Sequence, residues 1–164
     1  MELPEPDGFD GWYRTTYPRL FTAMLAACGD RDVAAEVADE AFLRVWSRWD
    51  RVCAMDAPEG WTYRVALNLL RTQLRRRRVE RRLLPRLVRR GDVDPPAGEV
   101  WELVRMLPPR QRIAVVLRYV ADLDEQHIAE AMRITRGTVA STLAAARRTL
   151  GAALHDDDVV EDFS

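Results

Sequence analysis

Apolar residues recur every three or four positions along most of the chain, a spacing that predicts amphipathic helices. The clearest stretch covers residues 32–49, and Asp30 just before it is typical of a helix N-cap. Another helix is predicted to begin near Pro58, because proline is favoured in a first helical turn. Pro18 is expected to open or kink an earlier helix. Further helices are predicted over residues 9–28, 99–107, 109–121, 124–132 and 136–154.

The absence of any alternating strand pattern predicts an all-α protein. Three prolines and two glycines fall close together after the second long helix, as is typical of a linker. We therefore expect two small helical domains joined by a flexible linker. The expected segments are a first domain over 8–84, the linker over 85–98, a second domain over 99–154 and an acidic tail over 155–164.

The net charge of −1 conceals strong local blocks of charge. Residues 63–90 contain 11 arginines and one acid, a net charge of +10, whereas residues 1–62 carry −6. So many like charges repel one another on a free helix, and such blocks are usually interaction surfaces. The distribution is therefore typical of a protein that binds nucleic acid.

Composition also excludes several classes of function. All 25 basic residues are arginine, so lysine Schiff-base and Walker-type phosphate chemistry are impossible. Apolar runs are far shorter than the about 20 residues of a membrane span, and the amino terminus is acidic, so we expect a cytoplasmic protein without membrane insertion. Cys28 and Cys53 lie far from each other and from both histidines. We therefore expect no metal site, no cofactor and no catalytic residues.

The arginine block begins with a regular stripe. Residues 64, 68, 71, 75, 78 and 82 are spaced four, three, four, three and four apart, which places them on one helical face. Guanidinium groups in a row suit a phosphate backbone, and Trp61 and Tyr63 could stack on unpaired bases. The alternative is a solvated face with Trp61 in the core. The candidate DNA contacts are Trp61, Arg64, Asn68, Arg71, Arg75, Arg76, Arg77 and Arg78.

A helix-turn-helix is predicted between residues 123 and 150. Its first helix follows Asp124, and Thr135 is a suitable N-cap for the second. Two short helices joined by a three-residue turn place the second helix in the major groove of DNA.

Four runs resemble bacterial extracytoplasmic-function sigma factors of the sigma-70 family, and most of all the short actinobacterial type. GDR at 29–31 with AEVADEAFLRVW at 35–46 resembles the family's polymerase-binding helix. PEGWTYRVALNL at 58–69 looks like the element that reads the minus-ten box. LPPRQR at 107–112 with VLRY at 116–119, then IAE at 128–130 and GTV at 137–139, is similar to the carboxy-terminal domain, which binds the minus-thirty-five element.

This resemblance covers about residues 9–150 and implies a function. The partners would be core RNA polymerase, promoter DNA and an anti-sigma factor, and residues 50–57 would lie beside a flipped-out minus-ten base. The implied polymerase contacts are Glu36, Asp39, Glu40, Leu43 and Arg44. The implied minus-thirty-five contacts are Arg136, Thr138, Ser141, Thr142, Arg147 and Arg148.

The chain departs from the family pattern in the helix-turn-helix. Arg133 stands where the turn usually has Gly, and a positive φ there would cost about 1 kcal/mol. Ala140 and Thr142 replace two cations. Two alternatives follow, a stand-alone helix-turn-helix regulator and a degenerate sigma-like interaction protein.

Overall fold

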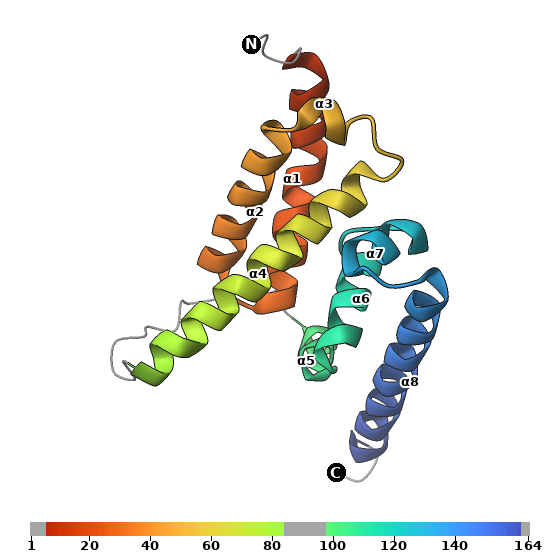
Figure 1. The fold of residues 1–164 in the computed structure, drawn as a ribbon. Coiled ribbons are helices and arrows are strands. Elements are labelled where there is room, and N and C mark those ends of the chain that lie inside the picture. Colours follow the sequence, from red (N-terminus) through yellow and green to blue (C-terminus); the bar gives the residue numbers. More distant parts are fainter. Residues whose placement is uncertain (1–5, 84–97, 162–164) are drawn as a thin grey trace.

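The computed structural model describes the backbone of residues 6–83 and 98–161, which form eight helices and no strand (Figure 1). An all-helical fold is therefore confirmed for these residues. The predicted linker lies almost entirely outside the described residues. The helices are α1 (Pro6–Cys28), α2 (Arg31–Trp46), α3 (Trp49–Val52), α4 (Pro58–Leu83), α5 (Glu99–Met106), α6 (Pro109–Tyr119), α7 (Glu125–Met132) and α8 (Arg136–Glu161).

The first three long helices, α1, α2 and α4, pack together around an apolar core. Leu20 and Met24 of α1, Val37 of α2 and Leu67 of α4 are almost completely buried. Burying a side chain of this size contributes roughly 1.5–3 kcal/mol, so this core holds the three helices together.

The turn between α1 and α2 is built by two adjacent residues. Gly29 adopts a positive φ of 68°, which a residue without a Cβ adopts with little strain. Asp30 then caps α2, because its carboxylate accepts a 3.0 Å hydrogen bond from the backbone N–H of Val33. The predicted N-cap is thus confirmed, and the same carboxylate also forms an ion pair with Arg77 of α4.

Two helix boundaries differ from those considered in the sequence. Pro18 does not open a helix, since α1 begins at Pro6 and contains it. The helix expected over 32–49 ends at Trp46, since Arg48 has a φ of −137° outside the helical region. Trp49 then begins the short α3, and its ring lies 5.3 Å from that of Phe9 in α1.

The second group of helices, α5 to α8, has its own packed interior. Leu117, Ile128 and Leu143 meet there from α6, α7 and α8. Helix α8 runs on to Glu161, so the first part of the predicted acidic tail is helical.

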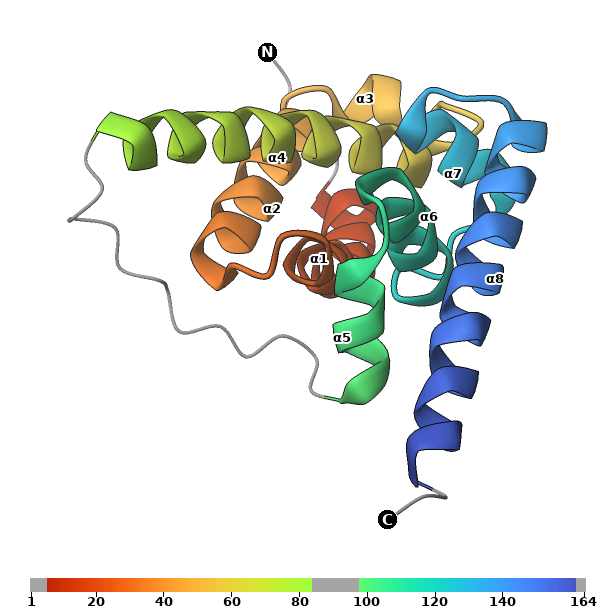
Figure 2. The ribbon, with the colours of Figure 1, turned by 90° about the horizontal axis from the view of Figure 1, so that it is seen from below.

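The two groups pack directly on each other. Helix α7 lies on the first turns of α4, and α6 lies against α1. Figure 2 shows α1 almost end-on, with α2 on one side and α6 on the other. The buried residues of both groups form one continuous cluster, which brings sites predicted for two separate domains close together.

Candidate nucleic-acid and polymerase interfaces

The arginine stripe lies along one side of α4. Asn68, Arg71, Arg75 and Arg78 are all exposed, as their common spacing predicts. Arg64 is half-buried, and Arg82 lies outside the residues whose side chains are described. This exposed row can meet successive negative charges of a partner that runs along the helix.

Arg77 differs in its surroundings from the other arginines in the predicted set of DNA contacts. It follows Leu70 by seven residues and therefore lies on the core-facing side of α4. Its guanidinium pairs with the carboxylate of Asp30, whose side chain is only 16% exposed. Arg77 thus fastens α4 to the turn between α1 and α2 and does not widen the exposed stripe.

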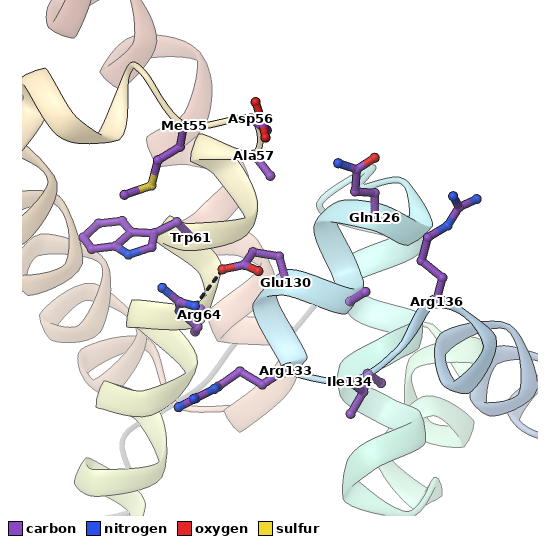
Figure 3. Close-up of a pocket in the computed structure, with 11 residues that line it drawn as sticks. Met55, Asp56, Ala57, Trp61, Arg64, Gln126, Glu130, Arg133, Ile134 and Arg136 are labelled. Atoms are coloured by element: carbon purple, nitrogen blue, oxygen red, sulfur yellow. Dashed lines mark hydrogen bonds and ion pairs between the residues drawn. The ribbon is translucent and has the colours of Figure 1, made fainter.

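The two aromatic residues at the start of α4 have different environments. Tyr63 is 1% exposed, so the prediction that it could stack on bases is wrong. Burial raises the pKa of its phenol, and its hydroxyl has no hydrogen-bond partner among the described residues. Trp61 is half-buried and lies beside Met55 in the lining of an open pocket (Figure 3).

A groove of about 620 Å³ separates the exposed sides of α2 and α4. All five predicted polymerase contacts line it, namely Glu36, Asp39, Glu40, Leu43 and Arg44. Asn68 and Arg76, which the sequence assigned to DNA, line the same groove from α4. Leu43 is 63% exposed, so an apolar side chain lies open to solvent among acidic ones.

Hydrogen bonds hold the acidic side chains of this groove in place. The Tyr17 hydroxyl donates to Asp39 over 2.6 Å, and the pKa of Tyr17 is raised, first by burial and then by this carboxylate. Gln73 donates to Glu36 over 3.1 Å, and Arg44 pairs with Glu40 over 2.9 Å. The groove therefore presents oriented carboxylates around Leu43, which favours a partner that is basic and partly apolar.

The helix-turn-helix has the predicted three-residue turn between α7 and α8. Asp124 caps α7 by accepting from the backbone N–H of His127 over 2.8 Å, and that bond lowers the pKa of Asp124. Thr135 caps α8 in the same way, since its hydroxyl accepts from the N–H of Thr138 over 3.1 Å. Both caps confirm the prediction.

Arg133 occupies the left-handed region of the turn, with a φ of 56°. Its N–H bonds to the carbonyl of Glu130, and the N–H of Ile134 bonds to that of Ala129 over 3.1 Å. These are the two bonds of a Schellman cap, which usually has glycine at this position. Arg133 therefore has a positive φ at the position of the turn where the family usually has Gly.

The candidate contacts on α8 differ in how freely they can reach a base. Arg136, Ser141, Arg147 and Arg148 are exposed, whereas Thr138 and Thr142 are half-buried. Ser141 and Thr142 each donate a hydroxyl proton to the carbonyl of Thr138, over 3.0 and 2.7 Å. Their hydroxyls are thus left mainly as acceptors toward a partner.

An open pocket of about 550 Å³ joins the two groups of helices. Figure 3 shows Trp61 and Arg64 on one side of it and Glu130, Arg133 and Arg136 on the other. Arg64 and Glu130 form a 2.6 Å ion pair across it. Sequence reasoning missed Glu130 because it placed the two sides in separate domains.

A glycine allows this close approach. A Cβ on Gly60 would lie 2.9 Å from the carbonyl oxygen of His127, which is closer than real Cβ atoms come, and 3.1 Å from the Cβ of Glu130, which is tighter than most real contacts. The sequence does hold a signal, because glycine in a helix is less stable than alanine and often marks a close approach.

Three further predictions concern the loop before α4, membrane insertion and metal binding. The expected loop over 50–57 is partly helical, since α3 includes residues 50–52. Across 6–83 and 98–161, no helix is long and apolar enough to cross a membrane. No group of three or more metal-ligating side chains occurs in that part of the chain.

Comparison with known proteins matches both groups of helices. Residues 12–80 match the family described as sigma-70 region 2, and residues 97–150 match sigma-70 region 4. The RNA polymerase sigma-E factor of Streptomyces avermitilis is 26% identical over 156 residues, covering 92% of this chain and 87% of the relative. That of Streptomyces coelicolor is 25% identical over 140 residues, covering 82% and 79%.

Two solved structures share the fold over nearly the whole chain. The sigma factor RpoE of Bartonella quintana, in complex with the anti-sigma factor NepR, superposes with a TM-score of 0.77 at 19% identity, covering 92% of this chain and 98% of that one. CnrH, in complex with the cytosolic domain of CnrY, gives a TM-score of 0.68 at 21% identity, covering 94% and 92%.

These matches define a two-region helical transcription factor that carries regions 2 and 4 in order. The chain belongs to the sigma-70 family and is an RNA polymerase sigma factor of the extracytoplasmic-function type, as its sequence resemblance indicates. A stand-alone helix-turn-helix regulator does not account for region 2.

The backbone of Arg133 gives a testable expectation. Arg133→Gly should raise the free energy of unfolding by about 1 kcal/mol, because glycine adopts a positive φ without steric strain. Urea denaturation measures this change. The matched control is Arg147→Gly within α8, which should lower stability by roughly 0.5–1 kcal/mol. A change of the same sign in both variants would contradict the assignment of strain to Arg133.

Proposed function

We propose that this sigma factor holds core RNA polymerase in the α2–α4 groove and promoter DNA on the arginine face of α4 and on α8. It thereby directs the polymerase to promoters and initiates transcription. The observation that carries the proposal is that the groove and the exposed arginine row lie on neighbouring sides of the single helix α4. A polymerase bound in the groove would bring DNA alongside the arginines.

The groove supports polymerase binding through its chemistry. Its carboxylates are oriented by hydrogen bonds, and Leu43 offers an exposed apolar anchor among them. A few side chains that enter a partner's pockets supply most of the affinity of many interfaces, while the surrounding charges select the partner. Asn68 and Arg76 belong with this groove as much as with DNA.

The arginine row supports binding to the DNA backbone. Arg71, Arg75 and Arg78 can each pair with a phosphate, and such contacts release counterions. Trp61, at the beginning of the same helix, can stack on a base of the melted minus-ten strand. On α8, Arg136, Arg147 and Arg148 would bind phosphates, and Ser141 and Thr142 would accept hydrogen bonds from bases.

The remaining parts of the proposal follow from this role. The protein binds and positions other molecules and performs no catalysis of its own. It acts in the cytoplasm, where RNA polymerase meets chromosomal DNA. An anti-sigma factor is proposed as a further partner, since the similar structure of RpoE is a complex of a sigma factor with the anti-sigma factor NepR.

Run-off transcription with purified core polymerase on genomic fragments tests the proposed function. We expect transcripts that require both the protein and the core enzyme. A degenerate sigma-like protein would bind the polymerase without yielding a transcript, and a stand-alone regulator would bind the same fragments equally well without polymerase.

The apolar anchor of the groove provides a first quantitative test. Leu43→Ala should weaken binding to core polymerase about tenfold, because truncation removes an anchor surrounded by charged groups. The control is Leu74→Ala, since Leu74 is also exposed but lies on α4 outside the groove. Titration of labelled protein with core polymerase measures both. Equal affinities for the two variants would remove Leu43 from the interface.

The arginine row provides a second test, on the holoenzyme. Replacing Arg75 and Arg78 by Ala should reduce the slope of log affinity for promoter DNA against log salt by about 0.7 to 0.9 for each phosphate that is no longer bound. Arg77→Ala is the matched control, since its guanidinium is paired with Asp30. It should keep the wild-type slope. A wild-type slope in the double variant would show that the row is only a solvated face.

A further inference from the structure

The hydroxyl of Tyr17, on α1, reaches one of the proposed polymerase contacts on α2. It donates to Oδ1 of Asp39 over 2.6 Å, a length typical of a strong hydrogen bond from a hydroxyl to a charged carboxylate. Asp39 lines the α2–α4 groove, whereas the described lining of that groove comes from α2 and α4 alone. Tyr17 therefore acts on a groove residue from outside the groove.

The ring of Tyr17 is held in place by its neighbours. Its centroid lies 5.0 Å from that of Tyr13 and 5.4 Å from that of Phe42, a core residue that is only 3% exposed. Aromatic rings at such distances attract one another. Two rotatable bonds determine where a tyrosine ring lies, so a ring fixed by packing also fixes the position of its hydroxyl oxygen.

Asp39 is held by a neutral donor and therefore keeps its charge. Glu40, the next residue of α2, is instead paired with the cationic Arg44 over 2.9 Å. Within the described part of the chain, Asp39 forms no ion pair. Because Tyr17 bonds to Oδ1, the other oxygen of Asp39 is left to accept from a cation of the partner.

The other two carboxylates of the groove are held less firmly. The side chains of Arg44 and Glu40 are 47% and 46% exposed, and exposed ion pairs of this kind contribute little net stability. Gln73 bonds to Glu36 over 3.1 Å, a longer distance than that between Tyr17 and Asp39. Asp39 is therefore the carboxylate of the groove whose position is fixed most strongly.

We propose that Tyr17 is a positioning residue for polymerase binding, because its hydroxyl holds the carboxylate of Asp39 in place without neutralising it. The inference rests on the proposed role of the α2–α4 groove. It adds α1 to the elements that determine affinity for polymerase, although α1 itself needs no contact with the partner. A carboxylate that is already in place loses less conformational freedom when a basic partner binds.

Removal of a single oxygen atom tests this inference in the full chain. Tyr17→Phe keeps the ring but loses the donor, and affinity for core polymerase should fall about threefold. A released aspartate distributes over several staggered rotamers, and affinity scales with the fraction of molecules in the competent one. Titration of labelled protein with core polymerase measures the change.

Tyr13→Phe is the matched control. Tyr13 packs against Tyr17 and Phe42 and is 38% exposed, but the hydroxyl bonded to Asp39 is that of Tyr17. This variant should keep the wild-type affinity. Urea denaturation of every variant confirms that each is folded before the titration.

A double-mutant cycle distinguishes positioning from a structural role of Tyr17. Asp39→Ala should weaken binding to core polymerase about tenfold, because a charged contact is lost. Tyr17→Phe should have no further effect in the Asp39→Ala chain, since the two residues act as one unit. If Tyr17 only supported the packing of α1 on α2, its substitution would weaken binding equally in both backgrounds.

The outcomes separate this inference from the proposed function. If Asp39→Ala weakens binding but Tyr17→Phe does not, the groove contact stands and the role of Tyr17 is overturned. Equal losses from Tyr17→Phe with and without Asp39 would overturn it too, because the hydroxyl would then act by another route. Wild-type affinity in Asp39→Ala would exclude both residues from polymerase binding. Absence of run-off transcription with the wild-type chain would contradict the proposed function, and the affinity cycle would still decide the role of Tyr17.

Discussion

Helix α4 is the element on which the rest of the molecule depends, because three different sides of this 26-residue helix each have a separate role. One side enters the core with α1 and α2, a second forms the groove with α2, and a third carries the exposed arginines. Each residue is rotated by about 100° from the one before it, so one inserted residue would move every later side chain onto a different side. The positions of the core, groove and arginine residues along α4 are therefore constrained together.

The alternation of charge along the chain has a structural explanation in the ion pairs of α4. An arginine block of net charge +10 repels itself, and acids from other elements relieve part of that repulsion. Asp30 lies in the acidic first third of the chain and forms an ion pair with Arg77. Glu130 lies in the acidic stretch before α8 and forms an ion pair with Arg64. The arginines between them remain exposed for a partner. Intramolecular pairing thus selects which positive charges are available.

The same pairing relates the two proposed partners to each other. The acidic groove and the start of α4 lie on different parts of one rigid helix, and α7 packs on only one of them. The groove is therefore open in the same structure in which the start of α4 contacts α7.

Features that depend on neighbouring residues could be predicted from the sequence by itself. The helices, the caps at Asp30 and Thr135 and the three-residue turn all follow from local spacing and local hydrogen bonds, and the family follows from short matched runs. Only the tertiary structure decided the roles of Arg77 and Arg64, since their partners lie 47 and 66 residues away in the chain. The approach of α7 to Gly60 belongs to the same class, because helical periodicity specifies which side of a helix is apolar but not which distant helix covers it.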